Sequence, residues 1–107
     1  MIILKNSQLD KDVINALQTI TSVELPAKQA FRLMRIIKEV TSLVEDKIKF
    51  EKKIRDKYQG DIEVLESQLQ DFLSIENTIE YEKINFDDLN LEFAKVSDLM
   101  KLDFLFS

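Results

Sequence analysis

The amino-acid sequence predicts a mainly α-helical fold, with one domain over residues 1–107 built on a long central helix. One glycine and one proline leave few residues for the tight turns of an all-β fold. Apolar residues recur at steps of three and four along most of the chain, which is typical of amphipathic helices. We expect two shorter antiparallel helices beside the long one. A small β element should join an N-terminal strand to a C-terminal strand.

The N-terminal segment predicts a strand followed by a helix. Residues 1–4 are apolar and largely β-branched, which favours a short strand. Asn6 or Ser7 should then cap a helix over roughly 7–21, because their side chains accept hydrogen bonds from free backbone N–H groups. The buried face of this helix should consist of Leu9, Val13, Ala16, Leu17 and Ile20.

The long helix should begin at Pro26, since a first helical turn tolerates the missing N–H of proline. No helix-breaking residue lies between Pro26 and Tyr58, so we expect a helix of about 30 residues that rises about 1.5 Å per residue. The first half carries a wide apolar face formed by Ala30, Phe31, Leu33, Met34, Ile36, Ile37, Val40, Leu43 and Val44. Heptad spacing, typical of coiled coils, connects Ile36, Val40, Leu43, Lys47, Phe50 and Ile54.

A third helix should follow a short turn. Gly60 is expected to end the long helix in a left-handed conformation, and Asp61 to begin the next helix, which runs to about Ser74. The short connection makes the two helices antiparallel neighbours. We expect Leu69 to be buried between them, so that Leu69→Ala costs about 2–5 kcal/mol. The whole predicted face is Ile62, Leu65, Leu69, Phe72 and Leu73.

The last third is predicted to contain a strand and a short helix. Residues 78–84 mix β-branched and aromatic residues with charges, which favours a strand paired with residues 1–4. Residues 86–93 fit either a second strand or a turn of helix. Ser97 should cap a final helix whose apolar side is Leu99, Met100, Leu102, Phe104, Leu105 and Phe106.

The residue types predict a protein that is not an enzyme and needs no cofactor or metal. The chain has no histidine and no cysteine, so the commonest general base and the commonest metal ligands are missing. A single glycine excludes a phosphate-binding loop. The acidic pairs Glu63–Glu66 and Asp87–Asp88 lie in segments that predict solvated rather than catalytic carboxylates. No apolar run is long enough for a signal peptide or a membrane span, which favours a cytoplasmic location.

Charge is unevenly distributed along the chain. Residues 26–58 carry ten basic and five acidic side chains, whereas residues 59–107 carry three basic and twelve acidic ones. One interpretation is a self-complementary fold in which the basic and acidic segments neutralise each other. The alternative is a partner-binding surface on the second half of the long helix, formed by Lys49, Lys52, Lys53, Arg55 and Lys57.

A basic surface of this kind would also suit nucleic acid, since clustered Lys and Arg neutralise phosphates. The interleaved Glu51 and Asp56 and the net charge of −5 argue against nucleic acid as the partner.

The apolar C-terminus has two interpretations. Phe104 and Phe106 either complete the core or form an exposed patch for association. Phe50 and Tyr58 present the same choice, because a second copy could cover them if the following helix does not. Heptad spacing would then support a homodimer.

Four short motifs follow one another along the chain: Leu4-Lys5-Asn6, Leu25-Pro26-Ala27-Lys28, Lys57-Tyr58-x-Gly60 and Leu65-x-x-x-Leu69-x-x-Phe72-Leu73-x-Ile75-Glu76. These motifs resemble those of a family of small proteins encoded by phages of Gram-positive bacteria. This chain lacks the longer insertion that members often carry after the third motif, and the resemblance supplies no catalytic residues.

The resemblance and the missing catalytic equipment together favour a phage-encoded accessory protein that binds another protein of the host or the phage. It would modulate a host factor or a defence system, or assist assembly, in the host cytoplasm. A self-associating structural component, including one in the virion, is the first alternative. Nucleic-acid binding through the basic half of the long helix is the second.

Overall fold

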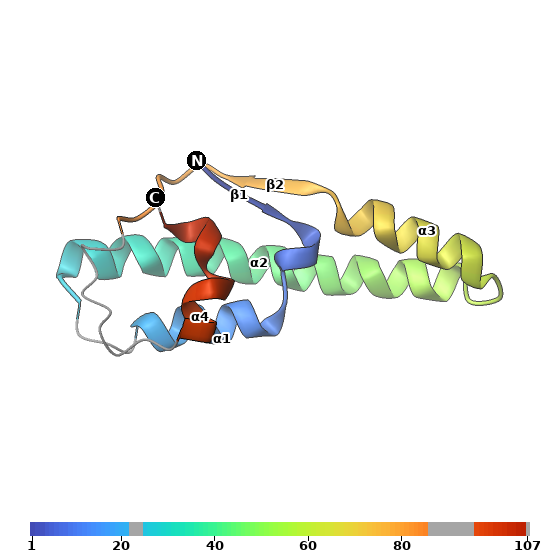
Figure 1. The fold of residues 1–107 in the computed structure, drawn as a ribbon, viewed down its shortest axis with the longest axis horizontal. Coiled ribbons are helices and arrows are strands. Elements are labelled where there is room, and N and C mark those ends of the chain that lie inside the picture. The colour runs from blue at the N-terminus through green and yellow to red at the C-terminus, as the bar shows by residue number, and fades with distance from the viewer. Residues whose placement is uncertain (22–24, 86–95, 107) are drawn as a thin grey trace.

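The computed structural model describes residues 1–21, 25–85 and 96–106 and is mainly helical (Figure 1). The prediction of a long helix and of a small sheet is confirmed. In chain order the elements are β1 (Ile2–Lys5), the 3-10 helix η1 (Asn6–Gln8), α1 (Lys11–Thr21), α2 (Ala27–Lys57), α3 (Ile62–Leu73), β2 (Glu76–Ile79), α4 (Val96–Lys101) and the 3-10 helix η3 (Asp103–Leu105).

Helix α2 has 31 residues and runs along most of the 51 Å length of the molecule (Figure 1). Pro26 stands just before the first helical residue, and its carbonyl accepts a hydrogen bond from the Ala30 amide at 2.9 Å. Arg55 and Lys57 lie in the last turn, where positive charge interacts favourably with the helix dipole. The radius of gyration is 15.8 Å. A compact domain of this length would have about 13 Å, so α2 makes the molecule elongated.

The core lies between the N-terminal half of α2, helix α1, the C-terminal helices and the sheet. The predicted inward face of α1 is confirmed, since all five of its residues are buried. The remaining core residues, besides that face, are Ile2, Leu4, Leu33, Ile36, Val40, Val44, Ile79, Ile84, Leu102, Phe104 and Leu105.

The start of α1 differs from the prediction. Asp10, not Asn6 or Ser7, caps the helix, with its Oδ1 accepting a hydrogen bond from the Val13 amide at 2.9 Å. Asn6 and Ser7 lie in η1 instead. The reason is tertiary, because the side chain of Asn6 is buried and makes its hydrogen bonds to distant parts of the chain.

Strands β1 and β2 form a two-stranded antiparallel sheet in which Ile2 pairs with Ile79 and Lys5 with Glu76. The predicted strand over 78–84 is therefore wrong in its limits, since β2 ends at Ile79. Strand β1 has only four residues and offers no partner beyond that point. The following segment meets the C-terminus, where the Ile84 amide donates to the Leu105 carbonyl at 2.9 Å.

The apolar face of α2 is narrower than predicted. Phe31 is 55% exposed and Met34 is 57% exposed, although both belong to the expected face. Successive residues of a helix are about 100° apart, so Met34 lies beside the buried stripe and Phe31 lies nearly opposite it. The buried residues of the first half of α2 are Leu33, Ile36, Val40 and Val44.

Helix α3 begins as predicted and packs differently. The Asp61 side chain accepts a hydrogen bond from the Val64 amide at 3.2 Å and caps the helix. Ile62 is 70% exposed and Leu69 is half-buried, so the predicted burial of these two residues is wrong. Gly60 is not in the left-handed region, which contradicts the expected cap. The rest of the face, half-buried like Leu69, is Leu65, Phe72 and Leu73.

The C-terminal helix α4 begins at Val96, one residue before the predicted cap Ser97. Along its predicted apolar side, Leu102, Phe104 and Leu105 are buried and Met100 is 74% exposed. The prediction for residues 86–93 lies outside the described residues.

Candidate functional site

The second half of α2 and helix α3 form a two-helix extension, residues 46–75, which we call the arm (Figure 1). Helix α3 contacts α2 along the arm, and none of the residues of α3 is buried. Half of the ten most exposed large hydrophobic residues in the described part of the chain belong to the arm. These are Ile48, Phe50, Ile62, Val64 and Ile75.

A groove of ≈ 440 Å³ runs between the two helices of the arm. Two of its lining residues, Phe50 and Phe72, have their rings 5.2 Å apart between centroids, tilted by 33°. Phe50 is 52% exposed, so this aromatic pair is open to solvent on one side. The apolar lining consists of Phe50, Ile54, Tyr58, Phe72 and Ile75, and the polar lining of Lys53, Lys57, Gln68 and Asp71.

A second hollow of ≈ 390 Å³ continues the groove toward the sheet. It shares Phe50, Phe72 and Ile75 with the first hollow, so these three side chains form one apolar strip along the arm. The other residues around this second hollow are Asn6, Leu43, Asp46, Lys47 and Asn77.

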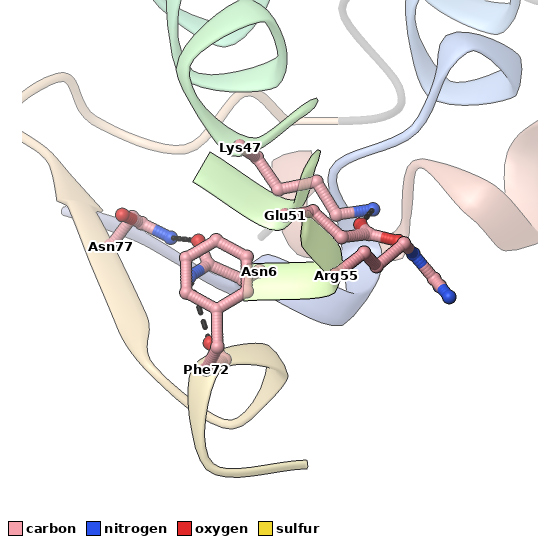
Figure 2. A network of polar contacts seen from close by, with 6 residues as sticks. All are labelled: Asn6, Lys47, Glu51, Arg55, Phe72 and Asn77. Carbon is pink, nitrogen blue, oxygen red and sulfur yellow. Dashed lines mark hydrogen bonds and ion pairs between the residues drawn. The ribbon is translucent and has the colours of Figure 1, made fainter. Parts of the chain in front are cut away.

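Asn6, in η1, connects the end of α3 in the arm to strand β2 through hydrogen bonds (Figure 2). Its Nδ2 donates a hydrogen bond to the Phe72 carbonyl at 2.8 Å, and its Oδ1 accepts one from Asn77 Nδ2 at 2.7 Å. Its backbone amide donates to the Ile75 carbonyl at 2.9 Å. The last carbonyls of a helix lack partners within the helix, so Asn6 satisfies one of them at the end of α3. The position of α3, and with it one wall of the groove, is thereby fixed.

Glu51 bridges two cations on α2 (Figure 2). Its carboxylate lies 3.3 Å from Lys47 Nζ and 3.0 Å from Arg55 Nη2. Partial burial alone would raise the pKa of Glu51. The hydrogen bond from Arg55 and the charge of Lys47 outweigh it together, so the pKa lies below its ordinary value of 4.5. The charge of Arg55 is therefore partly neutralised within the protein.

The structure separates the five basic residues that the sequence singled out. Lys53 and Lys57 line the groove. Lys52 and Arg55 instead line a shallow hollow beside Leu9 and Lys11, and Lys49 is exposed outside both hollows. The five cations therefore do not form one continuous face, which a nucleic-acid backbone would require.

The two C-terminal aromatic residues do not form an exposed patch. Phe104 is 7% exposed and belongs to the core, and Phe106 is half-buried against it. Of the two interpretations of the C-terminus, the core interpretation fits the structure. Sequence reasoning missed Asp71, Phe72 and Ile75 as lining residues of the groove. The sequence did point to this region, because Phe50 and Tyr58 are apolar and need to be covered either by the following helix or by a second copy.

A more polar hollow of ≈ 420 Å³ lies at the other end of α2. The guanidinium carbon of Arg35 lies 4.8 Å from the centroid of the Tyr81 ring and 5.8 Å from that of Phe31. Glu80 and Glu82 line the same hollow, so its cations face carboxylates as well as an aromatic ring. This mixture selects neither an anion nor a cation.

In the part of the chain that the structure describes, no three acidic side chains converge to hold a metal ion. None of the described helices is long and apolar enough to cross a membrane.

Comparison with known proteins identifies no relative: no family model, no curated protein and no solved structure matches the chain.

Proposed function

We propose that this chain is a non-enzymatic accessory protein that acts by binding protein, and that the groove of the arm is its binding surface. The main observation behind this proposal is that Phe50 is 52% exposed in a groove formed by two helices. Exposed apolar patches with a polar rim usually mark interaction sites on small proteins.

The dimensions of the groove suit a helical partner. Helix α3 has 12 residues and is therefore about 18 Å long, which corresponds to about three turns of a docked helix. Helix-in-groove recognition uses apolar anchors on successive turns, and the strip of Phe50, Phe72 and Ile75 offers such anchors a continuous surface. Lys53, Lys57 and Asp71 supply the polar rim.

The resemblance of the short motifs to those of small phage proteins supports a role during phage infection of a Gram-positive host. In that role the protein would modulate a host factor or a defence system, or assist virion assembly, in the host cytoplasm. A self-associating structural role is the second candidate. It is favoured by the opposite charges of Lys53 and Asp71 on one apolar groove, because a second copy would complement both.

The test is affinity capture from infected cells that produce tagged wild-type protein or the variant Phe50→Glu. Phe31→Glu is the matched control, because Phe31 is 55% exposed on the same helix and lies outside the arm. We expect wild type and Phe31→Glu to capture the same protein in stoichiometric yield and Phe50→Glu to lose it. Circular dichroism checks that both variants are folded. Equal capture by Phe50→Glu would contradict the assignment of the groove.

The non-enzymatic part of the proposal has its own test. Purified protein should not hydrolyse generic ester, phosphoester or nucleotide substrates above the uncatalysed rate. Turnover that disappears when acidic residues such as Glu63 and Glu66 are replaced by glutamine would overturn it.

A further inference from the structure

We propose that the occupant of the groove is the arm of a second copy, so that two arms pair about a two-fold axis into a four-helix bundle. The inference rests on the proposed function, because it takes the groove to be a protein-binding surface. It adds the identity of the partner.

The first argument is the incomplete packing of the arm. Helix α3 contacts α2 and buries no residue completely, and on the side of the groove Phe72 remains half-buried while Phe50 and Ile75 are each 52% exposed. Two helices alone cannot enclose a core, and helical proteins meet this need with further helices packed on the same apolar side. A second arm laid on the strip of Phe50, Phe72 and Ile75 supplies two.

The second argument is the arrangement of charge around the strip. Lys53 and Lys57 line the groove toward the turn at residues 58–60, and Asp46 lines the hollow toward the sheet. Asp71 lies on the wall formed by α3. No ion pair joins any of these four side chains to another residue that the structure describes.

A two-fold axis brings the same patch of both copies together, so a patch with both signs of charge is complementary to itself. Asp46 and Lys57 are about 16 Å apart along α2. An inverted second copy therefore brings Lys57 of each arm toward Asp46 of the other. A foreign segment of one sign would be repelled by one of these two ends.

The third argument is the exposed area. The chain exposes 7394 Å². A compact monomer of its mass of 12.5 kDa would expose roughly 6,200 Å². The chain therefore exposes roughly 1,200 Å² more than a compact monomer, which is enough to supply the roughly 800 Å² that each partner buries in a specific interface.

The experiment is sedimentation equilibrium of the untagged full chain from low to high micromolar concentration. We expect a concentration-dependent rise from the chain mass of 12.5 kDa to twice that mass for wild type and Phe31→Glu. Phe50→Glu should stay at the chain mass throughout.

A charge exchange tests the geometry. Lys53→Glu with Lys57→Glu, and separately Asp46→Lys with Asp71→Lys, should each abolish the dimer, because each makes the patch predominantly one sign. Mixing the two double variants should restore a species of twice the chain mass. Failure of the mixture to associate, while wild type dimerises, would overturn the pairing proposed here, as would a dimer that persists in Phe50→Glu.

A wild-type protein that is monomeric at every concentration would also overturn the inference. Affinity capture then separates the two proposals. If a monomeric protein still captures another protein in a Phe50-dependent way, the proposed function stands and only the second copy is rejected. If it captures none, both fail.

Discussion

Asn6 is the only buried polar side chain among the described residues, at 6% exposure. Both halves of its amide are satisfied, by the Phe72 carbonyl and by Asn77. Asn77 also donates to the Leu4 carbonyl at 3.3 Å, so the network extends from the sheet to the end of α3. A buried amide needs its partners, because an unsatisfied buried polar group costs more than a hydrogen bond contributes. The network therefore holds the end of α3 against the sheet and η1.

Replacing Asn6 by alanine should lower the free energy of unfolding by about 1–3 kcal/mol, because it removes two buried side-chain hydrogen bonds, one to the Phe72 carbonyl and one from Asn77. Asn15→Ala is the matched control, since Asn15 is exposed on α1. It should change stability by no more than about 0.5 kcal/mol. Urea unfolding of both variants measures the difference. Equal small effects of the two substitutions would contradict the assigned role of Asn6.

Glu51 makes a prediction about pH. A carboxyl group whose pKa is lower in the folded chain stabilises the fold above its unfolded pKa, and this stabilisation is lost as the pH falls. For Glu51 the loss should begin near the ordinary value of 4.5 and continue below it. Glu51→Gln should therefore cost up to about 1 kcal/mol at pH 7, the range of exposed ion pairs. It should cost little in strong acid.

Thermal unfolding of wild type and Glu51→Gln across this pH range measures the effect. Glu45→Gln, which removes an exposed glutamate from the same helix, is the control. A difference between wild type and Glu51→Gln that grows as the pH falls would show that the carboxylate is not stabilised by Lys47 and Arg55.

At the scale of the elements, α3 is the least enclosed of the longer helices. Leu69→Ala should cost about 1 kcal/mol, roughly half of the free energy gained by burying a leucine completely. Ile36→Ala should cost about 2–5 kcal/mol, because Ile36 is 1% exposed in the core. Urea unfolding of dilute protein gives both values. A cost for Leu69→Ala as large as that for Ile36→Ala would mean that α3 is enclosed in the monomer.

The turn between α2 and α3 offers a stabilising substitution. Gly60 has no left-handed backbone conformation, and no atom lies within 4 Å of the position of an added Cβ. Gly60→Ala should therefore raise the free energy of unfolding by about 0.4–1 kcal/mol, since alanine has less backbone freedom in the unfolded chain. The midpoint of urea unfolding should rise with an unchanged slope. A lower midpoint would indicate that the turn requires glycine.

Periodicity predicts which residues share a face of a helix, and it does not say whether another element covers that face. For α1 the predicted face is also the covered face, because α2, the sheet and the C-terminal helices enclose Val13 and Leu17. For α3 it is not, since Leu69 lies on the expected face and is left half-buried although α2 and the short η1 both contact this helix. Phe31 is exposed for a different reason, because it lies nearly opposite the buried stripe of α2.

Competition between equivalent local signals explains the remaining differences. Asn6 and Asp10 are both good helix caps, and the distant partners Phe72 and Asn77 decide that Asn6 is used elsewhere. Of the site, sequence reasoning identified the cations Lys53 and Lys57 because charge density is local. It missed Asp71, Phe72 and Ile75 because a groove depends on how two helices meet.

At the scale of the whole molecule, basic α2 and acidic α3 lie side by side, and no ion pair joins them among the residues that the structure describes. The three ion pairs in the described part of the chain join Glu51 to Lys47 and Arg55 within α2, and Lys101 to Asp12 between α4 and α1. Under the proposed pairing of two arms, a second copy would supply partners for the opposite charges of Asp46 and Lys57.

A dimer formed through the arm links stability to protein concentration. An association that only the folded chain can make stabilises it by mass action, so the melting temperature of wild type should rise as the protein concentration increases. The melting temperature of Phe50→Glu should not depend on concentration, whereas Phe31→Glu should follow wild type. Differential scanning calorimetry over a hundredfold range of concentration measures this. Because the proposed contacts of Lys53 and Lys57 are partly exposed, added salt should weaken the dependence without abolishing it, the apolar strip being insensitive to screening. A wild-type melting temperature that is constant over the whole range would place the exposed strip of the arm outside any self-association.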